Sequence, residues 1–166
     1  MKTTFLFLII FGPGLAQPPA AKTFDRLKTL TGAWAGSSAQ GPVEVHFRES
    51  SSGSALVSEI HGSQGYRDGM ISVFHLDGAR LMMTHYCSIG NQPRMALSGP
   101  AGANKFEFEF FDATNLADPK AGHMQRVVIT IIDPDHHTEA WTFADHGKET
   151  TDTYDLRRAA LENHEP

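Results

Sequence analysis

Apolar and polar side chains alternate with a period of two over most of the chain. The alternation is clearest where Phe106, Phe108 and Phe110 are interleaved with two glutamates, and it recurs between Val43 and Phe47. This period places successive side chains on opposite faces of a β-strand, so that one face is apolar and the other is wet. The pattern predicts ten strands, at residues 32–38, 43–49, 55–62, 69–76, 79–87, 94–98, 105–111, 124–132, 138–144 and 149–157.

One short segment follows a helical period instead. Phe24, Leu27 and Leu30 recur at helical spacing for two turns, which predicts a short helix before the first strand. The strands are separated by residues that favour tight reversals, such as Asp77-Gly78. Ten short strands joined mainly by tight turns predict an all-β fold, an antiparallel up-and-down barrel, because closure removes the exposed edges of the sheet.

The N-terminal residues are typical of a secretory signal peptide. Lys2 precedes an apolar run at 5–11, and small residues end at Ala16, which predicts cleavage before Gln17 and an exported protein, periplasmic or secreted. The apolar run is too short for a bilayer core of about 30 Å, so we expect no stable membrane insertion. The expected organisation is a signal peptide at 1–16, a flexible leash at 17–22, one barrel domain at 23–158 and a disordered tail at 159–166.

Charge and cysteine content narrow the classes of function. The chain has 166 residues with 19 acidic and 14 basic side chains, a formal net charge of −5, which disfavours binding to a nucleic-acid backbone. Cys87 is the single cysteine, so no disulfide forms within the chain, and we expect a small buried hydrophobic side chain there. No pair of histidines has the spacing of a metal site, and we expect no metal. The pattern leaves the oligomeric state open, a homodimer included.

A motif at the start of the predicted barrel carries a family resemblance. The segment Leu27-x-x-Leu30-x-Gly32-x-Trp34-x-Gly36 resembles the opening of calycin-type β-barrels, which comprise lipocalins, fatty-acid-binding proteins and nitrobindin-like haem barrels. The resemblance implies a short N-terminal helix that closes one end of the barrel. It also implies one small apolar molecule held inside, as is common in small barrels of this kind.

The same resemblance implies structural roles for a glycine, a tryptophan and an arginine. In calycins the tryptophan of the first strand packs beneath an arginine near the end of the last strand, and Arg157 or Arg158 stands at that place. A guanidinium stacks on an indole while it donates hydrogen bonds to carbonyl groups of the closing helix. We therefore expect Gly32, Trp34 and this arginine to stabilise the closed barrel.

The haem-binding members of the group need an axial histidine late in the chain. His136, His137 and His146 are late enough, but each lies in or beside a polar turn, where we expect a solvated side chain. We accordingly expect no haem and no other cofactor.

Reactive and hydrogen-bonding residues are densest at 84–95. Leu81, Met83 and His85 share a face that points into the predicted barrel, while the 90–94 segment is a turn whose polar groups lie at the barrel mouth. At the mouth Arg94 is a candidate to hold a carboxylate, and the alternative is a strut bonded to that turn. We expect a small, largely apolar ligand, or an amphiphilic one with an acidic head group, bound by Leu81, Met83, His85, Tyr86, Asn91, Gln92 and Arg94.

Two other classes of function stay open. If Asp77-Gly78 is a two-residue turn, Met70 faces His85 and Asp68 faces Cys87. A small secreted hydrolase or isomerase would then use Cys87 as nucleophile, His85 as base and Asp68 to orient the imidazole. The third hypothesis is an interaction module, with an exposed apolar outer face at Val73, Met82 and Tyr86.

Overall fold

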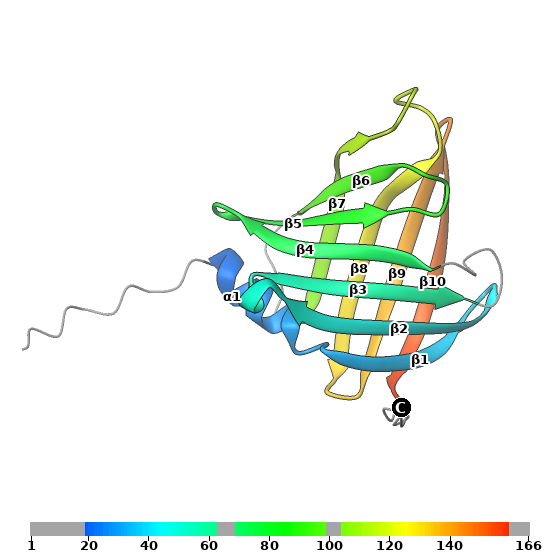
Figure 1. Ribbon diagram of the computed structural model, residues 1–166. Helices are drawn as coiled ribbons and strands as arrows, with labels where there is room; N and C mark the ends of the chain where they lie inside the picture. The colour runs from blue at the N-terminus through cyan, green and yellow to red at the C-terminus, as the bar shows by residue number, and fades with distance from the viewer. Residues whose placement is uncertain (1–18, 63–68, 99–103, 160–166) are drawn as a thin grey trace, which may run out of the picture.

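The computed structural model describes residues 19–62, 69–98 and 104–159, which form one helix and ten strands (Figure 1). The predicted signal peptide, Asp68 and residues 160–166 of the predicted tail lie outside these ranges. The elements, in chain order, are α1 (Pro19–Lys28), β1 (Gly32–Ser38), β2 (Gly41–Ser50), a 3-10 turn (Ser51–Gly53), β3 (Ala55–Gly62), β4 (Met70–Asp77), β5 (Arg80–Tyr86), β6 (Gln92–Leu97), β7 (Lys105–Thr114), β8 (His123–Asp133), β9 (His136–Asp145) and β10 (Lys148–Arg158).

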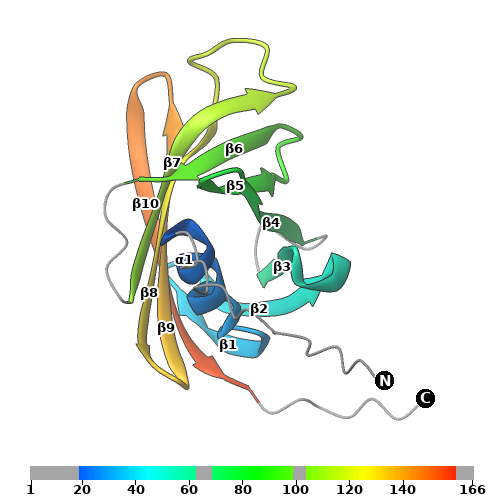
Figure 2. The ribbon, with the colours of Figure 1, turned by 90° about the vertical axis from the view of Figure 1, so that its left-hand side faces the viewer.

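The strands form a closed antiparallel barrel, which confirms the predicted fold class. Each strand pairs with the next along the chain, and β10 returns to pair with β1, where Gly36 lies opposite Leu156. Among the described residues the barrel therefore has no open sheet edge, the arrangement that tight turns and alternating strands favour. Figure 2 views the end of the barrel that α1 covers.

Helix α1 buries an apolar stripe against this end. Phe24 and Leu27, three residues apart, are buried, and Leu30 follows them into the core just after the helix. Pro19 suits the first helical position, because its missing N–H would have no partner there. Residues 19–22, which we expected to be a leash, are thus part of the helix.

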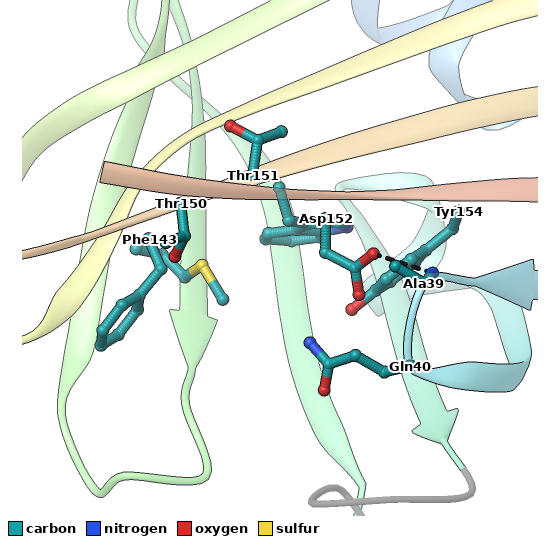
Figure 3. A pocket seen from close by; sticks show the side chains of 9 residues that line it. Ala39, Gln40, Phe143, Thr150, Thr151, Asp152 and Tyr154 are labelled. Carbon is teal, nitrogen blue, oxygen red and sulfur yellow. Dashed lines mark hydrogen bonds between the residues drawn. The ribbon is translucent and has the colours of Figure 1, made fainter. Parts of the chain in front are cut away.

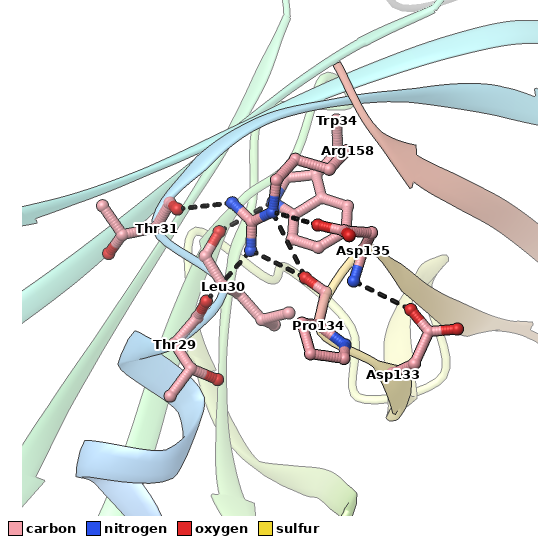
Figure 4. Close-up of polar contacts among 8 residues, drawn as sticks. All are labelled: Thr29, Leu30, Thr31, Trp34, Asp133, Pro134, Asp135 and Arg158. Atoms are coloured by element: carbon pink, nitrogen blue, oxygen red, sulfur yellow. Dashed lines mark hydrogen bonds and ion pairs between the residues drawn. The ribbon is translucent and has the colours of Figure 1, made fainter. Parts of the chain in front are cut away.

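Arg158 and Trp34 join the first strand, the last strand and the helix. Of the two candidate arginines, Arg158 is the one that stacks: its guanidinium carbon lies 4.2 Å from the centroid of the Trp34 ring (Figure 4). It donates hydrogen bonds to the carbonyl oxygens of Thr29, Thr31 and Pro134. Trp34 Nε1 in turn donates to the Leu30 carbonyl at 2.7 Å. One cation and one indole therefore satisfy backbone oxygens from the helix end and from the β8–β9 turn.

Gly36 permits the close approach of β1 and β10. A Cβ built at this position would lie 1.8 Å from the carbonyl oxygen of Asp155, a distance that no side chain tolerates. Gly32 has a φ of +131°, and a Cβ there would meet the Arg158 guanidinium at 2.7 Å. The two glycines of the motif thus serve strand pairing and the arginine.

The predicted register between β4 and β5 is wrong by two residues. Asp77 pairs with Arg80 around a two-residue turn of Gly78 and Ala79, in which Gly78 has a φ of +58°. Glycine adopts that conformation without strain, and a glycine at the first central position is typical of hairpin turns. His85 therefore lies opposite Ser72, where we had expected Met70.

Replacement of Arg158 by alanine should destabilise the barrel. The variant loses the stack on Trp34 and the hydrogen bonds to three carbonyl groups, which we expect to lower the free energy of unfolding by about 1–3 kcal/mol. Urea denaturation measures this change. The matched control is Arg157→Ala, because Arg157 is the exposed neighbour on the same strand and should shift stability by less than about 0.5 kcal/mol. Equal effects of the two changes would contradict a structural role specific to Arg158.

Candidate functional site

Two adjoining cavities lie at the barrel mouth, the end opposite α1. Their volumes are about 170 Å³ and about 250 Å³ (Figure 3). The β1–β2 turn, the β5–β6 turn and the start of β10 contribute lining residues to the cavities. Helix α1 covers the opposite end of the barrel, which carries the β8–β9 turn. Of the described residues, four line both cavities: Gln40, Met124, Phe143 and Thr150.

The cavity walls combine aromatic and sulfur-containing side chains with a few polar groups. The smaller cavity is further lined by Ala39, Trp141, Thr151, Asp152 and Tyr154, and the larger by Met70, Cys87, Ser88 and Ile89. Each volume lies below the roughly 300–1,000 Å³ of drug-sized ligand sites. An apolar cavity with few polar groups is typical of a binding site for a small molecule.

Asp152 is a carboxylate that faces into the barrel. Its register partner on β9 is Trp141, and residues directly opposite each other in an antiparallel pair share a face. Oδ1 accepts a hydrogen bond from the Ala39 backbone N–H at 3.2 Å (Figure 3). Oδ2 is buried and has no hydrogen-bond partner among the described residues. This is a polar group at the cavity wall with unused capacity to accept a hydrogen bond.

Beneath the cavities, β9 turns three polar side chains inward. His137, Glu139 and Trp141 are spaced by two residues, so they share the inner face of the strand. Glu139 Oε1 lies 3.1 Å from His137 Nε2, and Glu139 Oε2 accepts a hydrogen bond from Trp141 Nε1 at 2.9 Å. All three side chains are buried. Each oxygen of the Glu139 carboxylate therefore has a hydrogen-bond partner, which offsets the cost of burying this carboxylate in the core.

The interior polar layer continues on the opposite wall. His85 Nδ1 lies 2.9 Å from Ser72 Oγ, and the His85 ring centroid lies 5.0 Å from that of Trp141. Burial lowers the pKa of His85 to about 4, so the imidazole is neutral near pH 7. His85 Nε2 and His137 Nδ1 are both buried without a hydrogen-bond partner among the described residues.

The expectation that His137 is solvated is wrong. Strand β9 begins at His136, two residues before the predicted start, and this places His137 on the inner face. Its ring packs edge-on against Trp34, with centroids 4.3 Å apart. His146 is exposed, as expected for a turn, and His136 lies beside Asp155 on β10.

The residues that we expected to contact a ligand are divided between core and surface. Leu81, Met83 and His85 are at most 1% exposed and line neither of the two mouth cavities. Tyr86 points outward and is 50% exposed. Side chains from around the barrel fill the space that we had assigned to the ligand.

The three polar residues expected at the mouth have protein partners. Asn91 Nδ2 donates to the Gly122 carbonyl at 2.8 Å, and Gln92 Nε2 donates to the Gly90 carbonyl at 2.9 Å. Arg94 forms a bidentate ion pair with Asp112 on the outer surface. Asn91 and Gln92 thus hold the loops at the mouth. In the described structure the Arg94 guanidinium is paired with Asp112, so it neither lines a cavity nor forms the predicted strut to the 90–94 turn.

The residues of the alternative catalytic site do not meet in the described structure. Within the described ranges, His85 has its hydrogen bond with Ser72 and none with Cys87. Cys87 lines the larger cavity, whereas His85 is enclosed by the core. Asp68, the third residue, lies outside the described residues.

The outer face that we had expected to be apolar is partly covered. Met82 is only 4% exposed and Val73 is half-buried, while Tyr86 and its register partner Ile71 are exposed. Arg80 covers one side of the exposed Phe111 ring, with its guanidinium carbon 5.1 Å from the centroid.

Most residues at the cavity walls were not predicted from the sequence, above all Asp152 and Trp141. The signal for Asp152 was present, because Asp152 shares the parity of Tyr154 and Leu156, which alternation places on the inner face of β10. No comparable signal marks Gln40, which reaches the cavity from a turn.

The architecture is consistent with a calycin-like fold: ten antiparallel strands close into a barrel, and one short helix covers an end. No protein-family model matches the chain, and no curated protein matches it either. Within residues 19–62, 69–98 and 104–159, no helix has the length and apolar character needed to cross a membrane.

The buried neutral imidazole of His85 should make stability depend on pH. An unfolded histidine binds a proton near pH 6.5, while His85 in the folded barrel binds one only near pH 4. Between these values the unfolded state holds more protons, so the free energy of unfolding should fall by about 3 kcal/mol as the pH decreases. The variant His85→Gln keeps a polar partner for Ser72 but has no imidazole. Chemical denaturation at several pH values should therefore show a fall in its free energy of unfolding that is smaller than that of the wild type by about 3 kcal/mol. His46→Gln, at an exposed site, should show the same fall as the wild type; an identical pH profile for both variants would refute the assignment to His85.

Replacement of Glu139 by glutamine should also destabilise the barrel. A glutamine side chain has one carbonyl oxygen and an amide NH₂ group, so it accepts from only one of the two donors, His137 and Trp141. His137 then has to change tautomer to accept from the amide NH₂ group, and the charge-assisted hydrogen bonds of the carboxylate are lost. We expect a loss of about 1–3 kcal/mol in the free energy of unfolding. Glu44→Gln on the exposed face of β2 is the control, and thermal unfolding at constant pH distinguishes the two. A Glu139→Gln variant as stable as this control would contradict the inferred pairing.

Proposed function

We propose that this protein is an exported carrier or sensor that binds a small, largely apolar molecule in the two cavities at the barrel mouth. The observation that carries the proposal is the pair of adjoining cavities lined by Trp141, Phe143, Met70 and Met124. Such walls bind apolar groups by removing their surface from water. The predicted leader, with Lys2 and its apolar run, supports export.

The filled interior limits the size of this ligand. Large side chains such as Phe74, Met83, Met95 and Phe108 are buried below the mouth at 0–1% exposure. A ligand therefore occupies the mouth, and a long alkyl chain that runs the length of the barrel does not fit. Both cavity volumes favour a molecule well below drug size.

Binding is better supported than catalysis. Cys87 is the candidate nucleophile at the cavity wall, and the described residues that line the cavities include no histidine that would act as its base. A general base must lie within hydrogen-bond reach of the proton that it removes. The Ser72–His85 pair has the required proximity but is enclosed in the core.

Blocking the cavities should abolish binding of a neutral apolar probe. We expect N-phenyl-1-naphthylamine to bind wild-type protein saturably, with increased emission as the dye leaves water. Thr150 contributes to the walls of both cavities, so Thr150→Trp should fill them and weaken binding at least about tenfold, a loss of about 1.4 kcal/mol.

The control is Thr153→Trp, an exposed position on the same strand whose parity places it on the outer face. This variant should bind the dye like the wild type. Circular dichroism verifies that both variants fold. The proposal fails if the wild-type protein shows no saturable binding, or if Thr150→Trp binds the dye as tightly as Thr153→Trp.

A further inference from the structure

The smaller cavity combines one carboxylate with three aromatic side chains. Asp152 lines this cavity together with Trp141, Phe143 and Tyr154, which come from the adjacent strands β9 and β10. Figure 3 shows Asp152 beside Tyr154, with Phe143 further along the wall. Trp141 is the register partner of Asp152, and Phe143 is that of Thr150, so these side chains occupy successive levels of one inner wall. Anion and aromatic rings thus line the same space.

Among the described residues that line the two cavities, the Asp152 carboxylate has no cationic partner. The described residues that line the two cavities include no lysine, arginine or histidine. In the described structure Asp152 accepts a hydrogen bond from the neutral backbone N–H of Ala39, and its Oδ2 has no partner. A carboxylate that is partly removed from water is stabilised by a nearby positive charge. The cavity wall therefore has an unmet preference for a cation.

The aromatic rings favour the same charge. The face of a tryptophan, tyrosine or phenylalanine ring carries negative potential and attracts cations, and aromatic cages bind quaternary ammonium groups in this way. The methyl groups of such a cation also remove apolar parts of the cavity wall from water, which a hydrated metal ion does not do. By contrast, the wall offers an acidic head group no cationic side chain among its described residues.

We propose that the ligand of this protein is an organic ammonium cation, held by the Asp152 carboxylate and the aromatic side chains beside it. This inference rests on the proposed function, because it names the chemical class of molecule that the same mouth cavities bind. Asp152 supplies charge and a hydrogen-bond acceptor, Trp141 and Phe143 supply ring surfaces, and Gln40 borders the cavity from the β1–β2 turn.

A pair of probes with equal shape separates charge from size. Phenyltrimethylammonium and tert-butylbenzene differ in one atom, nitrogen against carbon, and therefore in charge but hardly in volume. Their dissociation constants follow from competition with N-phenyl-1-naphthylamine. In the wild-type protein we expect the cation to bind at least about tenfold more tightly than its neutral isostere, and benzoate to bind more weakly than both.

Asp152→Asn tests the residue that carries the proposal. The asparagine side-chain oxygen still accepts the hydrogen bond from Ala39, but the negative charge is lost, so the ratio of the two dissociation constants should fall to about one. Glu149→Gln removes an equal charge from an exposed position on β10 outside the cavities, and it should keep the tenfold ratio. Circular dichroism and the unfolding midpoint establish that both variants fold.

The outcomes distinguish failure of the two proposals. If the neutral dye does not bind the wild type at all, the proposed binding function fails, and this inference fails with it. If the dye binds but the cation has no advantage over tert-butylbenzene, the cavity binds apolar molecules without the proposed charge preference. If Asp152→Asn and Glu149→Gln reduce the preference for phenyltrimethylammonium equally, this preference comes from the overall negative charge of the protein. That result would overturn the assignment to Asp152.

Discussion

Closure of the barrel between β1 and β10 is the constraint on which the rest of the structure depends. The seam needs two backbones in close approach at Gly36, and it needs the cation of Arg158 over Trp34 with its hydrogen bonds to Thr29, Thr31 and Pro134. These contacts fix the helix end against the last strand. Without the seam, the inner faces of the strands would not share one core, and the cavities at the mouth would have no opposite wall.

The interior is divided into three levels along the barrel axis. Apolar side chains from α1 and the strands fill the capped end, where His137 packs against Trp34. The polar side chains of Ser72, His85 and Glu139 lie within the core, and the cavities occupy the mouth. Glu139 is held from two sides in this level, since each of its carboxylate oxygens has a donor. Hydrogen bonds between buried polar groups depend on direction, so this level favours one arrangement of the side chains around it.

The sequence predicted the fold more completely than it predicted the site. Alternation and tight turns are local signals, and they were sufficient for ten strands and their order. The β4–β5 register was wrong because it depends on which two residues of the turn take the central positions, and Gly78 takes the first. His137 was misplaced because a strand start that moves by two residues turns a solvated side chain into a core one. The cavities depend on the volumes of side chains that meet from distant strands, a property that no local pattern contains.

The two tryptophans of the chain mark the two ends of the barrel. Trp34 lies beneath Arg158 at the capped end, whereas Trp141 lines the smaller cavity and donates its indole N–H to Glu139. Indole emission changes with the polarity and charge of its surroundings. Variants with one tryptophan each therefore give the protein two separate optical reporters, one for the seam and one for the mouth. Emission that changes at Trp141 alone signals an event at the cavity, and emission that changes at both signals loss of the fold.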